Sequence, residues 1–172
     1  MTTTMTIADG LLQELEMEAA TTRRVLERIP DDQLSWRPHA RSRTLGELAQ
    51  HIAANPGSVC MLASQNPATP DFNQVDPVPT STAELLATLD ASMAQARQVL
   101  GAMSDDDLLE TWRMTAGGHE VMAMPRMALL RTVMLNHWYH HRGQLSVYLR
   151  QVGAAVPSIY GPSADENPFV PA

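Results

Sequence analysis

Two histidines four residues apart, His137 and His141, have the type and spacing to do chemistry. In an α-helix, residues four apart lie on one face, about 40° apart around the axis. Leu130, Met134 and Leu145 flank the pair and make that face apolar. Two buried imidazoles need partners for their ring nitrogens, and one metal ion serves both. The spacing therefore indicates a metal site, although two hydrogen-bonded core histidines would fit the pattern about as well.

His51 is the candidate for a third ligand. It lies on the inward face of a separate predicted helix, beside Leu48 and Ile52. A single inward histidine is most often a core residue whose ring nitrogens are hydrogen-bonded. Three inward histidines on two helices of one small bundle favour metal binding instead. We therefore predict that His51, His137 and His141 bind a divalent metal ion.

Two further residues near the histidine pair are candidates for catalysis or positioning. Gln144 follows His137 by seven residues, within about 20° of it around the helix. It could bond a ligand on the metal or a nearby backbone group. His140 is displaced by about 60–100° from the pair, toward a helix seam or solvent. Either side chain could assist with protons or with orientation.

Glu47 and Cys60 are weaker candidates. Glu47 lies one turn before His51 and could be a fourth ligand or a base. The segment Thr44-Leu-Gly-Glu47 is also a capping box, which explains the glutamate without any role in a site. Cys60 could be a soft metal ligand, but an inert buried cysteine fits the sequence better.

Other metal and nucleotide motifs are missing from the sequence. Trp138 follows His137, so the HExxH motif of zinc proteases is absent. The paired Glu-x-x-His motif of di-iron bundles and the glycine-rich phosphate loops are absent as well. Because no carboxylate of the motif is an obvious base, the sequence favours activation of a nucleophile by the metal.

Length and composition limit the class of protein. The chain has 172 residues, of which 44% are apolar and 18% charged, as expected for one globular domain. A formal net charge of −7 disfavours a nucleic-acid-binding protein. Its one cysteine excludes an intrachain disulfide. No signal peptide or membrane span is readable, so we expect a cytoplasmic protein that acts on a small molecule and binds neither nucleic acid nor membranes.

The charges are unevenly distributed along the chain. All 12 basic residues are arginines, and four of them lie between Val121 and Ala164, where there is no acidic residue. This locally basic stretch, which holds the histidine pair, could attract an anionic substrate. The alternative that we favour is pairing of these four arginines with acidic residues of the first and third predicted helices.

Four amphipathic segments must position the candidate residues. Apolar residues at spacings of three and four predict helices over residues 6–29, 44–65, 81–103 and 125–152. The triplet Asn55-Pro56-Gly57 interrupts the second helix, either as a proline kink or as a new helix start capped by the asparagine. With so little strand signal, the sequence predicts an all-α fold, a four-helix bundle in a single domain spanning residues 1–172.

Two connections between the helices are readable. Residues 66–80 contain four prolines and must form a loop. Gly117-Gly118, between two short runs, predicts a short β-hairpin between the third and fourth helices.

The histidine motifs resemble those of the DinB-like (DinB/YfiT) superfamily. The resemblance rests on three segments and covers nearly the whole chain: Thr44-Leu-Gly-Glu-Leu-Ala-Gln-His51, His137-x-x-x-His141-Arg-Gly-Gln-Leu and Ile159-Tyr-Gly-Pro-Ser-Ala-Asp-Glu166. It implies a four-helix bundle with long crossover connections. By position, it also implies that His51, His137 and His141 bind nickel or zinc.

The resemblance further implies a class of reaction. Characterised enzymes of the superfamily use low-molecular-weight thiols as co-substrates, and members are often homodimers. We therefore expect a homodimeric, metal-dependent thiol S-transferase. A small metallohydrolase and a non-enzymatic, metal-stabilised stress or binding protein are the alternatives. Activity without added thiol would identify the hydrolase, and a fourth protein ligand on the metal would identify the non-enzymatic protein.

Overall fold

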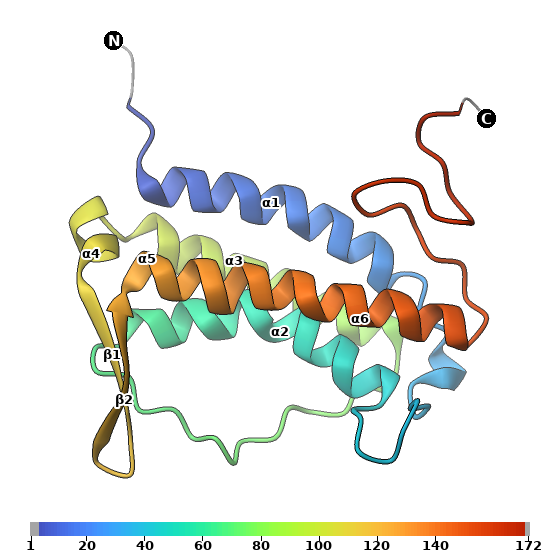
Figure 1. The fold of residues 1–172 in the computed structure, drawn as a ribbon, viewed down its shortest axis with the longest axis horizontal. Coiled ribbons are helices and arrows are strands. Elements are labelled where there is room, and N and C mark those ends of the chain that lie inside the picture. The colour runs from blue at the N-terminus through green and yellow to red at the C-terminus, as the bar shows by residue number, and fades with distance from the viewer. Residues whose placement is uncertain (1–3, 171–172) are drawn as a thin grey trace.

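Four long helices form the body of the protein (Figure 1). The computed structural model describes residues 4–170. The long helices are α1 (Ile7–Leu26), α2 (Leu45–Ser64), α3 (Thr82–Gly101) and α6 (His137–Gln151). Helices α1 and α6 run in one direction along the bundle, and α2 and α3 run in the other (Figure 1).

The order of the helices around the bundle differs from their order in the chain. Helix α1 packs against α3 and α6, and α2 packs against the same two helices, so α1 and α2 lie diagonally opposite. The two parallel helices α2 and α3 are joined by residues 65–81, which run back along the length of the bundle (Figure 1). The predicted four-helix bundle with a long crossover connection is confirmed.

A small hairpin lies at one end of the bundle (Figure 1). Strands β1 (Thr111–Ala116) and β2 (His119–Pro125) pair antiparallel, after the short helix α4 (Asp105–Leu109). Gly117 and Gly118 form the turn with φ of 57° and 81°. Two consecutive positive φ values suit the tight turns that join antiparallel strands, and glycine adopts them without steric cost. The predicted hairpin is therefore confirmed.

The fourth predicted helix, over residues 125–152, is not one regular helix. It begins as α5 (Arg126–Leu129), widens into a π-helical segment (Leu130–Asn136), and continues as α6. The His137 amide donates to Thr132 O, five residues back. A π turn adds one residue to the helix, and the apolar spacings of three and four along residues 125–152 gave no sign of it.

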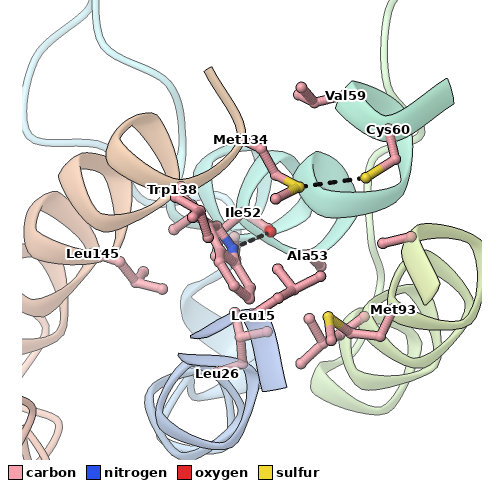
Figure 2. Close-up of a cluster of buried hydrophobic side chains, with 14 of the residues drawn as sticks. Leu15, Leu26, Ile52, Ala53, Val59, Cys60, Met93, Met134, Trp138 and Leu145 are labelled. Carbon is pink, nitrogen blue, oxygen red and sulfur yellow. Dashed lines mark hydrogen bonds between the residues drawn. The ribbon is translucent and has the colours of Figure 1, made fainter. Parts of the chain in front are cut away.

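Pro56 lies inside an uninterrupted α2. Proline has no amide hydrogen, so Ile52 O, four residues earlier, lacks its helical donor. The indole Nε1 of Trp138 supplies the missing hydrogen bond at 2.8 Å (Figure 2). The new helix start that the sequence allowed at Asn55 is wrong, because the chain passes Pro56 as one helix.

The residues on either side of Pro56 bind the neighbouring elements. Asn55 Nδ2 donates to Met134 O at 2.8 Å, near the end of the π-helical segment. Ser92 Oγ of α3 accepts from Gly57 N at 2.8 Å and donates to Ala54 O at 3.0 Å. A Cβ on Gly57 would lie 2.8 Å from Ser92 O, so the close approach of α2 and α3 requires glycine here. The proline region thus joins α2 to both of its neighbours.

The core lies between the four long helices. Leu15 and Leu26 of α1 and Met93 of α3 meet Trp138 of α6 there, and all are buried (Figure 2). No helix between residues 4 and 170 is both long and apolar enough to cross a membrane.

The four arginines of the acid-free stretch each meet a carboxylate. Two of these carboxylates lie on α1, as predicted. None lies on α3, so that part of the prediction is wrong. One of the other two carboxylates directly follows α4, and the last one lies in the C-terminal segment. The pairs are Arg131–Glu14, Arg142–Glu18, Arg126–Glu110 and Arg150–Asp165.

The hydrogen bond from Trp138 to Ile52 O can be tested with a double-mutant cycle. We expect Trp138→Phe to lower the free energy of unfolding by about 1–3 kcal/mol beyond any packing loss, because Ile52 O is left unpaired. In a Pro56→Ala background an amide at position 56 can donate to Ile52 O, so the same change should cost less. Urea unfolding measures all four proteins.

A matched control is Trp112, whose Nε1 donates to Leu62 O at 3.3 Å, away from the proline. Trp112→Phe should cost the same with and without Pro56. Equal costs of Trp138→Phe in both backgrounds would contradict the role given to the indole.

Candidate metal centre

The three predicted histidine ligands meet in space. His51 comes from α2, and His137 and His141 come from the start of α6. One nitrogen atom of each ring lies within 4.8 Å of the corresponding atoms of the other two. His51 Nε2 and His137 Nε2 are 2.9 Å apart. The structure thus brings the three histidines together, as their inward positions on two helices led us to expect.

The spacing of the ring nitrogens fits a single metal ion. Two nitrogen ligands with bonds of about 2.0–2.1 Å are about 2.9 Å apart at a right angle and about 3.4 Å apart at the tetrahedral angle. The distance between His51 and His137 matches the lower value. The three rings stand nearly perpendicular to one another, with centroids 4.3 to 5.1 Å apart. The cluster could therefore hold one ion without a large rearrangement.

Burial keeps the three imidazoles neutral. It lowers the pKa of His51 to about 3, assisted by the nearby positive charge of Arg43. Burial also lowers the pKa of His137 and of His141, and Arg43 contributes to both. At neutral pH each ring therefore has an unprotonated nitrogen, which a metal ligand needs.

Gln144 forms a hydrogen bond with one of the three imidazoles. Its Oε1 lies 2.6 Å from His141 Nδ1. An amide oxygen only accepts, so Nδ1 carries the hydrogen and Nε2 keeps its lone pair. The contact expected from the sequence was with a ligand on the metal or with a backbone group. The structure instead pairs Gln144 with a histidine of the cluster, in the manner of groups that orient metal ligands.

His140 and Glu47 lie outside the cluster. His140 is exposed, with its ring centroid 5.0 Å from that of His141. Glu47 Oε2 accepts from Thr44 N at 2.7 Å, and Thr44 Oγ1 accepts from Glu47 N at 3.1 Å. The capping box thus accounts for Glu47, which does not join the three histidines.

Cys60 is buried away from the histidines. Its Sγ donates to Met134 Sδ at 3.4 Å (Figure 2). Burial raises the pKa of this thiol to about 12, so it stays protonated at neutral pH. A thiolate is the form that binds metals, so Cys60 is a core residue and the soft-ligand alternative is wrong.

Two charged residues beside the cluster escaped the sequence analysis. Asp76 Oδ2 lies 4.0 Å from His51 Nδ1. Asp76 and Arg43 line one small cavity of about 210 Å³. Asp76 belongs to the proline-rich connection between α2 and α3, and Arg43 precedes the cap of α2. Neither position has a periodic pattern, so only the folded chain brings them to the site.

The depressed histidine pKa values predict acid sensitivity of the metal-free protein. The folded-state pKa of His51 lies below its unfolded value of 6.5, so below that pH the unfolded chain binds a proton that the folded chain does not. Stability should therefore fall as the pH drops from about 6.5 toward 3, by about 1.4 kcal/mol per pH unit for each such proton. Urea unfolding in the presence of a chelator should show a shallower decline for His51→Ala. The exposed His119 is the control, and its replacement by alanine should leave the slope unchanged.

Comparison with known proteins identifies relatives along almost the whole chain. A protein of Bacillus subtilis (strain 168), described as uncharacterized protein YrdA, is 33% identical over 161 residues, which cover 92% of this chain and 90% of the relative. The crystal structure of a DinB-like protein from Bacillus cereus ATCC 10987 superimposes with a TM-score of 0.69 at 29% identity, covering 91% of this chain and 99% of the other.

A more distant structure shares the fold. YfiT from Bacillus subtilis superimposes with a TM-score of 0.64 at 18% identity, covering 86% of this chain and 89% of its own. It is described as a probable metal-dependent hydrolase with an unusual four-helix bundle topology. The model of the DinB family matches residues 1–168. With this match and the relatives along nearly its full length, the chain belongs to the DinB family.

Proposed function

We propose that this chain binds one divalent metal ion through His51, His137 and His141 and is a metal-dependent enzyme. The observation that carries the proposal is the convergence of three neutral imidazoles in a half-buried cluster. Within the described part of the chain, no fourth histidine, cysteine or carboxylate joins that group. Three protein ligands with an open position are typical of catalytic sites, whereas structural sites have four. The donor set thus argues against the non-enzymatic alternative.

The chemistry follows from the donor set. A divalent ion held by three imidazoles would lower the pKa of a water or thiol bound to it and so supply a nucleophile near neutral pH. His51, His137 and His141 would hold the ion, and Gln144 would keep the His141 lone pair directed at it. Asp76 lies beside the Nδ1 edge of His51, where a carboxylate favours the ligand tautomer of that ring.

Two nucleophiles remain to be distinguished. The family resemblance favours a low-molecular-weight thiol and therefore an S-transferase. The description of YfiT as a probable metal-dependent hydrolase favours water as the second candidate. Assays of metal-loaded protein on electrophiles and on esters, each with and without added thiol, separate the two. The homodimer stays a prediction, which light scattering tests directly.

The first test is the metal content of protein purified without a polyhistidine tag. We expect about one divalent ion per chain, nickel or zinc, by inductively coupled plasma mass spectrometry. His51→Ala and His137→Ala should each lose it, because two imidazoles alone bind weakly. His119→Ala, in the exposed hairpin, should keep it. A metal-free wild type that takes up no added nickel or zinc would contradict the proposal.

The role of Gln144 predicts a smaller effect on affinity. Gln144→Ala should weaken metal binding about 10-fold to 100-fold, as is usual when a group that orients a metal ligand is removed. Competition with a chromophoric chelator measures the affinity. Gln151→Ala, at the exposed end of the same helix, is the matched control and should bind as tightly as wild type. Unchanged affinity of Gln144→Ala would exclude an orienting role.

A further inference from the structure

Within residues 4–170, the arginines that form no ion pair all lie in one segment. Nine of the 12 arginines lie within 4.0 Å of a carboxylate oxygen: Arg23, Arg24, Arg28, Arg97, Arg113, Arg126, Arg131, Arg142 and Arg150. The other three, Arg37, Arg41 and Arg43, lie in residues 37–43, the segment that leads into α2. Ion pairs within the described residues therefore do not account for these three cations, in a chain of net charge −7.

Arg43 places one of these cations beside the histidine cluster. It is exposed, and it lines the cavity of about 210 Å³ together with Asp76, whose carboxylate lies 4.0 Å from His51 Nδ1. The cavity therefore opens beside the proposed metal site and has a guanidinium in its wall.

The other walls of the cavity are mixed. Val75 and Val78 are large apolar side chains that stay exposed there. Glu47 also lines it, but its carboxylate accepts from the Thr44 amide in the capping box. Asp76 faces His51. Among residues 4–170, neither carboxylate forms an ion pair with Arg43, which lines the cavity beside the two valines.

The position of Arg43 has an electrostatic consequence when a metal is bound. Arg43, Glu47 and Asp76 together give the cavity lining a net charge of −1, and a divalent ion at the histidine beside Asp76 would change this local sum to +1, which favours an anion. A guanidinium also offers paired donors whose geometry matches a carboxylate. The volume is below the range of about 300–1,000 Å³ typical of sites for drug-sized ligands, so the occupant is small.

We propose that this cavity is the substrate subsite, and that it selects small organic anions by pairing their carboxylate with Arg43 while Val75 and Val78 contact the apolar part. This inference rests on the proposed function, because the cavity can be a substrate subsite only if the neighbouring metal site is catalytic. The binding of the anion itself depends on Arg43 and the cavity walls. The chemical class follows from this pairing: short-chain carboxylates bind, and their uncharged analogues do not.

The test uses pentanoate and its neutral analogue pentanamide as probes. Arginine Nε–H and backbone amide resonances would be followed by NMR in zinc-loaded and in metal-free protein. We expect pentanoate to shift the Arg43 Nε–H signal and the amides of Val75 and Val78 saturably, and pentanamide to leave them in place. Arg43→Gln should weaken pentanoate binding by at least about tenfold, the usual effect of losing a hydrogen bond to a charged group. Arg41→Gln, two residues away and outside the cavity lining, should bind like wild type.

The outcomes separate this inference from the proposed function. Zinc uptake with equal pentanoate affinity of wild type and Arg43→Gln would overturn the anion subsite and leave the metal site intact. Pentanoate binding that vanishes without zinc but survives in Arg43→Gln would be coordination to the metal alone and would also overturn it. A protein that takes up no zinc but still binds pentanoate through Arg43 would retain the subsite and lose the metal-dependent function.

Discussion

The missing amide hydrogen of Pro56 is the constraint on which the arrangement of α2 and α6 depends. It leaves Ile52 O without a helical donor, and the indole of Trp138 pairs with that carbonyl across the helix seam. Ile52 follows His51 in sequence and Trp138 follows His137, so this hydrogen bond constrains the separation of the two histidines. On the other side, Ser92 bridges Ala54 O and Gly57 N. Pro56, which is unfavourable in an isolated helix, thus helps to determine which helices pack against α2 and at which positions along it.

The arginines of this protein differ in whether they form ion pairs between helices. Arg142 is almost fully buried against Glu18, and Arg131 pairs with Glu14, so α6 and the π-helical segment before it are both tied to α1. Removing one partner of a buried pair leaves an uncompensated charge, which makes such contacts specific. Arg43 has no such partner within residues 4–170 and lines a cavity with Asp76, whose carboxylate lies 4.0 Å from His51. The same residue type therefore holds helices together in one place and remains free for an anion in another.

Burial of the three histidines links stability to the site. Desolvation opposes their protonated forms and so keeps lone pairs available for a metal, at a cost in stability on acidification. The π-helical segment before α6 belongs to the same arrangement. Its extra residue rotates everything that follows by about 100° relative to a regular helix, so the direction of His137 and His141 depends on it. Such segments occur often at functional sites, where they redirect a helix face.

The sequence by itself determined the four amphipathic helical segments, though not the π-helical part of the fourth, and also the hairpin turn at Gly117-Gly118 and the three inward histidines, because all of these depend on local spacing. Periodicity reports which face of a helix is buried, and HxxxH reports that two rings share a face. Only the tertiary structure decided how α2 passes Pro56, because the donor that replaces the proline amide comes from another helix. It alone brought Asp76 and Arg43 to the site, since both lie in irregular connections whose course is set by packing. The pattern shows which residues face inward, and the packing of helices distant in sequence decides which of them meet.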